Sequence, residues 1–142
     1  MIVISDLLQE RPLVGNYFAP DAYVQGDFEA GLIENRSGAR LIALPETLMQ
    51  AIYASLSSEV GSSIGVVLFK CGHWWGKNFY RRFNQEVSEY YAKNLAQMEM
   101  VEFLQCLKQC WKTHGWGLIE LETNYSKQGF MVVKVQHSAF AK

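Results

Sequence analysis

Three side chains that could bind a metal or carry thiol chemistry recur at a regular spacing near residue 110. Cys106, Cys110 and His114 are four residues apart, so an α-helix places them near one face. A rise of about 1.5 Å per residue puts Cys106 about 12 Å from His114 along the axis, too far for ligands of one ion. Only adjacent pairs of this set could chelate one ion; Cys110 with His114 could supply two ligands, and Cys71 or His73 could add a third. We therefore expect no metal site, and interpret these residues as core side chains with a hydrogen-bonded histidine.

Motifs that identify a reaction are missing from the sequence. It contains no glycine-rich phosphate loop, no nucleophile elbow and no paired-carboxylate motif. Glu120 and Glu122 alternate along a predicted strand, which is typical of a solvated face. We predict no catalytic residue and leave enzymatic activity open.

The densest aromatic cluster lies in residues 64–83, IGVVLFKCGHWWGKNFYRRF, which we expect to be a helix. Gly65, Gly72 and Gly76 form a strip along the edge of its apolar stripe, which consists of Ile64, Leu68, Cys71, Trp75 and Phe79. Glycine inside a helix costs about 1 kcal/mol relative to alanine, so the strip indicates that something approaches closely. Helix packing within the chain is the favoured explanation, and a ligand or dimer surface is the alternative.

A pocket for a flat apolar ligand would lie between this helix, a helix over residues 98–113 and the sheet. Arg82 either extends into solvent at the end of its helix or meets a carboxylate of the protein or of a ligand. The same aromatic side chains could instead fill one another's space as an ordinary core. The expected walls are Trp75, Phe79, Phe103, Leu107 and Trp111, with His114 and Arg82 as the orienting polar groups.

The remaining elements are predicted from turn residues and periodicity. Residues 1–25 are expected to form an N-terminal arm, and residues 85–97 a polar connection with some helical tendency. Hairpins are predicted over 27–45, turning at Ser37 and Gly38, and over 116–136, turning at NYSKQG. Helices are predicted over 45–60, ended by Gly61, and over 98–113, ended by Gly115. This order predicts an α+β fold, with an antiparallel four-stranded sheet from two hairpins flanking a central run of helices.

The composition bounds the class of protein. The chain has 142 residues, 49% of them hydrophobic, so we expect one domain over residues 1–142. A formal net charge of -1 gives no general attraction to nucleic acid. No signal-like start and no uninterrupted apolar run of membrane-spanning length is present, so a cytoplasmic protein without a transmembrane segment is expected. Its three cysteines, Cys71, Cys106 and Cys110, are expected to be buried and reduced.

Several segments together resemble the 4-vinyl reductase domain family, in particular its cyanobacterial members. They are GNYFAPDAYVQGDFEAGLIENRSGARLIALPETLMQAIY, the GxxxGKxFYRRF helix, and MEMVEFLQCLKQCWKTHGWGLIELE followed by FMVVKVQHSAFA. The resemblance covers most of the chain and rests on the order of elements, the glycine helix and the GWG. It implies a small-molecule-binding domain of a superfamily with aromatic sensors, Golgi transport-particle subunits and haem-based nitric-oxide sensors, which often dimerise.

The resemblance also has implications for the site. Ligand contacts of the aromatic sensors correspond to the neighbourhood of Trp111, His114, Val135 and His137. Family members normally continue with a further helix and a cysteine-bearing hairpin; we expect this segment to be absent here, so the zinc site of the sensors is not carried over.

We therefore expect a non-catalytic binding module, dimeric through its helices, for a hydrophobic or tetrapyrrole-like molecule in cyanobacterial pigment metabolism or photosystem assembly. The alternatives are an enzyme or enzyme subunit of chlorophyll vinyl reduction, which would need an electron source from a partner protein, and a ligand-free assembly factor.

Overall fold

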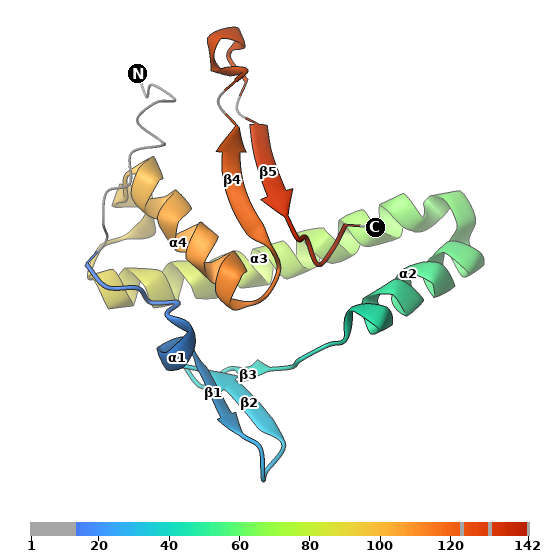
Figure 1. Cartoon of the computed structure of the whole chain (residues 1–142), viewed down its shortest axis with the longest axis horizontal. Coiled ribbons are helices and arrows are strands. Elements are labelled where there is room, and N and C mark those ends of the chain that lie inside the picture. Colours follow the sequence, from blue (N-terminus) through green and yellow to red (C-terminus); the bar gives the residue numbers. More distant parts are fainter. Residues whose placement is uncertain (1–13, 123, 131, 142) are drawn as a thin grey trace.

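The computed structural model describes residues 14–122, 124–130 and 132–141 (Figure 1). A long helix, α3, forms the axis of the molecule, and the other elements lie along it. In chain order the elements are α1 (Pro20–Tyr23), β1 (Val24–Asp27), β2 (Leu32–Asn35), β3 (Arg40–Leu41), α2 (Glu46–Val60), α3 (Ile64–Tyr91), α4 (Met100–Thr113), β4 (Leu118–Glu122) and β5 (Val132–Gln136). Short 3-10 turns occupy Gly61–Ser63, Leu95–Gln97 and Ser126–Gln128. The predicted α+β class, with antiparallel hairpins on either side of a run of helices, is confirmed.

The strands are divided between two sheets, instead of joining in the four-stranded sheet that we predicted. β1, β2 and β3 form one antiparallel sheet, and β4 pairs with β5 in another. Figure 1 shows the two sheets on opposite sides of α3. β3 is only two residues long, so its outer edge offers few backbone groups to a further strand.

The first sheet contains one strand more than the sequence predicted. β1 pairs along its length with β2, from Val24 opposite Asn35 to Asp27 opposite Leu32. Residues 28–31, predicted to begin a strand, form the turn, where Asp27 Oδ1 accepts a hydrogen bond of 3.1 Å from the amide of Ala30. The predicted turn at Ser37 and Gly38 is confirmed as the connection from β2 to β3.

Helices α2 and α3 form a hairpin at Gly61, whose φ of 55° favours glycine and ends α2 as predicted. α3 passes through its glycines without a break and continues to Tyr91. The predicted polar connection over residues 85–97 is therefore wrong for its first half. Val87 explains the extension, because this residue is completely buried and anchors the last turns of the helix.

Helix α4 begins with a capping box, in which Glu99 and Glu102 each accept a hydrogen bond from the other's backbone amide. Its buried residues are Val101, Leu104, Cys106 and Cys110. Phe103 is half-buried against the core, so the buried face is rotated relative to the predicted face of Phe103, Leu107, Cys110, Trp111 and His114.

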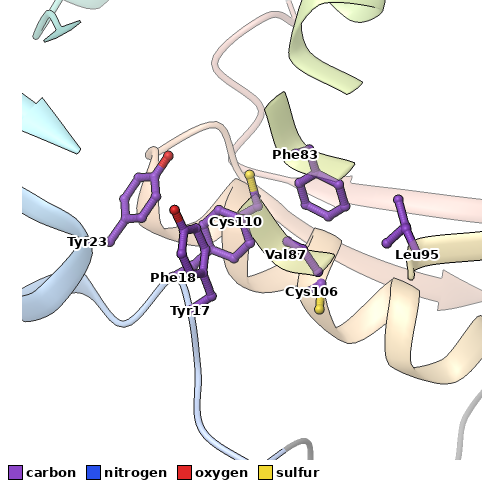
Figure 2. Packing of buried hydrophobic residues seen from close by; sticks show 8 residues of the cluster. All are labelled: Tyr17, Phe18, Tyr23, Phe83, Val87, Leu95, Cys106 and Cys110. Carbon is purple, nitrogen blue, oxygen red and sulfur yellow. The ribbon is translucent and has the colours of Figure 1, made fainter. Parts of the chain in front are cut away.

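The core lies where the N-terminal segment, the second half of α3 and α4 meet (Figure 2). Phe18 stacks on Phe83 with ring centroids 5.8 Å apart, and Cys110 is completely buried beside them. The core cluster comprises Tyr17, Phe18, Tyr23, Phe83, Val87, Leu95, Cys106 and Cys110. Three of these residues come from the described part of the expected N-terminal arm, and residues 1–13 of that arm lie outside the described residues.

Two long-range hydrogen bonds fix the N-terminal segment to α4. The hydroxyl of Thr113 donates to the carbonyl of Phe18, 95 residues away in the chain. The amide of Asn16 donates to the side-chain oxygen of Gln109, 93 residues away, over 3.3 Å. The segment is thus held by polar as well as apolar contacts with the C-terminal half of the chain.

Residues 46–78, which we call the helical arm, contain no buried residue. The predicted packing of the apolar stripe within the chain is wrong here: Leu68, Cys71 and Trp75 are exposed, as is Trp74, which is 71% accessible. A side-chain carbon added at Gly65, Gly72 or Gly76 would meet nothing within 4 Å, so no internal helix crossing explains the glycine strip. The physical reason is that the described chain covers little of this half of α3; Trp75, whose ring contacts Trp116 and Phe140, lies at the edge of the covered part.

The helical arm also carries the candidate for a membrane span. Among the described residues, the helical stretch Glu46–Tyr91, which includes the turn at Gly61–Ser63, is long and apolar enough to cross a bilayer by length and composition alone. One such stretch is weak evidence, since soluble proteins contain helices that meet the same criterion.

Candidate functional site

A cavity of about 230 Å³ lies between α3, the first sheet and the connection from α4 to β4. Phe18 and Tyr23 close it from the N-terminal segment, and His114 and Trp116 from the end of α4. Half of the lining residues carry an aromatic ring, His114 included, which suits a flat apolar molecule. The lining residues are Phe18, Tyr23, Asn35, Ala39, Arg40, Leu41, Trp75, Asn78, Phe79, Arg82, Phe83, Glu86, His114 and Trp116.

A hydrogen-bond chain runs along one wall of this cavity. The side-chain amide of Asn35 donates to the hydroxyl of Tyr23 over 3.4 Å, and the same hydroxyl lies 3.3 Å from Nε2 of His114. Nδ1 of His114 lies 2.7 Å from the carbonyl oxygen of Cys110, which belongs to the preceding turn of α4. Because a carbonyl only accepts, Nδ1 carries the proton and Nε2 accepts from Tyr23.

Aromatic contacts hold the imidazole of His114 in this position. Its ring stacks on Trp116 with a centroid distance of 4.3 Å, and Tyr23 meets it edge-on at 5.1 Å. Burial lowers the pKa of His114, since desolvation disfavours the charged ring. His114 is therefore neutral near pH 7, with both ring nitrogens already in hydrogen bonds.

The other titratable groups of this wall also remain uncharged. Burial raises the pKa of Tyr23 to about 12 and that of Cys110 to about 12. Neither group supplies an anionic nucleophile near neutral pH. The wall therefore offers shape and fixed dipoles, and its Tyr23 and Cys110 side chains are poorly suited to nucleophilic chemistry.

Asn35 is the buried polar residue that connects this wall to the first sheet. Its Oδ1 accepts hydrogen bonds from the amides of Ser37 and Ala39, at 3.0 and 2.9 Å, and thereby holds the turn between β2 and β3. Its amide group is left to donate to Tyr23. The hairpin turn and the cavity wall thus share one side chain.

Charged groups reach the cavity from α3 and β3. The carboxylate of Glu86 accepts a 2.5 Å hydrogen bond from the hydroxyl of Ser37. Arg40 donates to the carbonyl of Gly31 over 3.3 Å. Within the described part of the chain, the guanidinium of Arg82 has neither a hydrogen bond nor an ion pair. The lining thus holds two guanidinium groups against one carboxylate.

The structure brings four of the nine sequence-predicted ligand contacts together in the cavity. They are Trp75, Phe79, Arg82 and His114. Phe103 packs against the core, and Leu107 is half-buried on α4, so neither lines the cavity.

The other three predicted contacts lie beyond the cavity wall. Trp111 meets Trp116 edge-on at 5.8 Å, with its ring on the side of Phe140. Val135 and His137 are exposed on and just after β5. The ligand contacts that the resemblance implied at the fourth strand are therefore separated from the cavity that His114 lines.

Sequence reasoning missed the walls contributed by the N-terminal segment and the first sheet. Phe18 and Tyr23 come from an irregular stretch that has no helical or strand periodicity. A signal was present in Asn35, since an asparagine two residues before Ser37 can accept a hydrogen bond from that backbone amide and so hold a turn. Its contact with Tyr23 could not be read from spacing.

Metal binding is not supported by a cluster of ligands in the structure. Over residues 14–122, 124–130 and 132–141, no group of three or more His, Cys, Asp and Glu side chains could hold an ion. Cys110 Sγ and His114 Nδ1 lie 3.6 Å apart, and that nitrogen is bound to the carbonyl of Cys110. The expectation of no stoichiometric metal stays a prediction for elemental analysis.

No protein-family model, no curated protein and no solved structure matches this chain.

Proposed function

We propose that this domain is a non-catalytic binding module for a hydrophobic small molecule. The observation that carries the proposal is the 230 Å³ cavity with aromatic walls and a neutral, fully hydrogen-bonded His114. Cavities of this kind, lined by apolar rings with a few polar groups, are the usual sites of small ligands. The raised pKa values of Tyr23 and Cys110 favour binding over nucleophilic catalysis.

The cavity volume limits the size of the occupant. An apolar cavity of about 150 Å³ accommodates benzene, so 230 Å³ suits one ring or two fused rings. A tetrapyrrole could place only one edge in this space. The proposed setting in cyanobacterial pigment metabolism or photosystem assembly is supported by the family resemblance alone, as is the alternative of a chlorophyll vinyl-reduction subunit. The proposed cytoplasmic location is supported by the absence of an uninterrupted apolar run of membrane-spanning length in the sequence.

The proposal includes a two-fold dimer formed through the helical arm. Large apolar side chains on several sides of this helix are exposed, including Phe69 at 74% and Trp74 at 71%, and the glycine strip is open. A helix that is apolar on all sides is normally covered. Sedimentation velocity at micromolar concentration tests the dimer, and a monomer would contradict it.

Binding is tested with a neutral probe and two adjacent tryptophans. Wild type should bind β-naphthylmethanol, and Trp75→Ala, which removes a wall of the cavity, should weaken that binding about tenfold or more. Trp74→Ala is the matched control, because Trp74 is the same residue type and is also exposed, at 71% against 47% for Trp75, but does not line the cavity. Equal losses in both variants would show binding to the helical arm, and no binding by wild type would favour a ligand-free scaffold.

A further inference from the structure

The cavity has an excess of positive charge in a lining that is half aromatic. Arg82 and Arg40 bring guanidinium groups, and Glu86 brings the single carboxylate. Ser37 donates a hydrogen bond to Glu86, which ties that carboxylate to the hairpin turn. Electrostatics therefore favour an anionic group on the occupant over a cationic one.

Arg82 is the side chain with unused hydrogen-bonding capacity. Its five N–H donors have no hydrogen-bond acceptor and no ion pair among the described residues, whereas Arg40 already donates to Gly31. The planar fork of a guanidinium matches the two oxygens of a carboxylate. Arg82 is exposed, so it would meet this group at the mouth of the cavity rather than inside it.

The remaining polar groups of the lining do not compete for that role. His114 uses Nδ1 to donate to Cys110 and Nε2 to accept from Tyr23. The side-chain amide of Asn78 donates to the carbonyl of Trp74 over 3.1 Å. Charged donation to an occupant thus falls to the two arginines.

We infer that the ligand is an aromatic carboxylic acid of one or two rings, with its ring against the aromatic side of the cavity lining and its carboxylate paired with Arg82. The inference rests on the proposed function and specifies the ligand class for the same cavity. The size follows from the 230 Å³ volume, and the charge from the free guanidinium. The position of Arg82 at the mouth of the cavity predicts that its ion pair with the carboxylate contributes moderately to the binding free energy, because water partly screens the two charges.

The test compares two probes of nearly equal shape, β-naphthoate and its neutral amide, β-naphthamide, by calorimetric titration of the full chain. Wild type should bind the carboxylate about tenfold more tightly than the amide. Arg82→Gln should abolish this preference while keeping the affinity for the amide. Arg81→Gln is the matched control, since Arg81 carries the same charge on the same exposed helix but does not line the cavity.

The outcomes separate the inference from the proposal beneath it. The inference is supported if the preference for the carboxylate over the amide persists in Arg81→Gln and disappears in Arg82→Gln. Equal affinity of wild type for both probes, or a preference that persists in Arg82→Gln, overturns the inference and leaves the apolar cavity in place. Binding of neither probe overturns both.

Discussion

The two halves of α3 lie in opposite environments although both are rich in large apolar residues. In the second half, Phe83 and Val87 are enclosed by the N-terminal segment and α4. In the first half, Phe69 and Trp74 project from the helical arm without a neighbouring element. Hydrophobic content alone therefore does not decide which part of a helix is buried; the decisive factor is the presence of a second element with a matching face.

The cavity lies at the boundary between these two regions. Trp75 belongs to the last exposed turn, Phe79 is half-buried against the core, and Phe83 belongs to the first enclosed turn. An occupant would extend the core toward the helical arm.

The largest expected effect concerns the cysteines, because the chain places one in the helical arm and two in the core. Burial raises the pKa of Cys106 to about 11 and that of Cys110 to about 12, which makes their thiolates about a hundred- to a thousandfold scarcer than at the ordinary value of 9.0. Cys71 is exposed, contrary to the prediction that all three are buried. In the monomer, Ellman's reagent should therefore modify Cys71 rapidly and the other two only on unfolding.

This labelling also reports on what covers the helical arm. Slow modification of Cys71 at high protein concentration, becoming fast on dilution, would show that a second copy covers it. Cys71→Ser should remove the fast phase and serves as the control. Rapid modification of all three thiols in the folded chain would contradict the core described here.

A smaller effect is expected at the glycine strip. Gly72→Leu should shift the sedimentation coefficient from dimer to monomer, because a large side chain would block close approach of a second helix. Folding of the monomer should be unchanged or more stable by up to about 1 kcal/mol, since nothing lies within 4 Å of the added carbon and leucine favours helix. Gly72→Ala, which adds one small group, is the control. Retained dimer mass with lowered stability would instead indicate a helix crossing within the chain.

The smallest expected effect is the pH dependence of the enclosed region. Burial holds the pKa of His114 below its ordinary 6.5, so the unfolded chain binds a proton that the folded chain rejects. The free energy of unfolding should therefore fall as pH decreases from 6.5 toward the lower folded value, and be independent of this group above 6.5. Denaturant unfolding between pH 5 and pH 8, a range of about three units around the histidine pKa, measures the slope.

Substitution assigns that slope to one side chain. His114→Gln should remove the histidine contribution to the pH dependence of the free energy of unfolding. A change in stability at pH 8 would not alter this result, because the slope depends on the number of protons bound and not on packing. His137→Gln, at an exposed position, should retain it. An unchanged slope in His114→Gln would mean that another group in the enclosed region titrates in its place.

Local signals predicted much of the fold. Gly61 and Gly115 ended helices where a left-handed backbone was needed, with φ of 55° and 70°, and the turn at Ser37 and Gly38 was correctly placed. β1 was missed because its VQGD sequence has little strand propensity. Its backbone is held in a strand by pairing with β2. The end of α3 was missed because one buried residue, Val87, outweighs a polar surrounding sequence.

The site was predictable only where its residues share an element. Trp75, Phe79 and Arg82 follow each other on one helix, so their spacing put them together. Tyr23 and His114 meet from 91 residues apart, and no periodicity in a single sequence reports such a contact. Trp111 was predicted to line the cavity but lies outside it. The chain turns at Gly115 and brings Trp116 to the wall in its place.

The hydrogen bonds from Thr113 to Phe18 and from Asn16 to Gln109 cannot form until α4 has been synthesised. Ribosomes add roughly 5–20 residues per second, so the aromatic N-terminal segment waits for about 5 to 20 seconds before its partners on α4 have been made. During that interval Tyr17, Phe18 and Tyr23 have no completed core to enter. A nascent chain stalled before α4 should thus be a preferred client of ribosome-associated chaperones, and release from them should coincide with the emergence of residues 100–113.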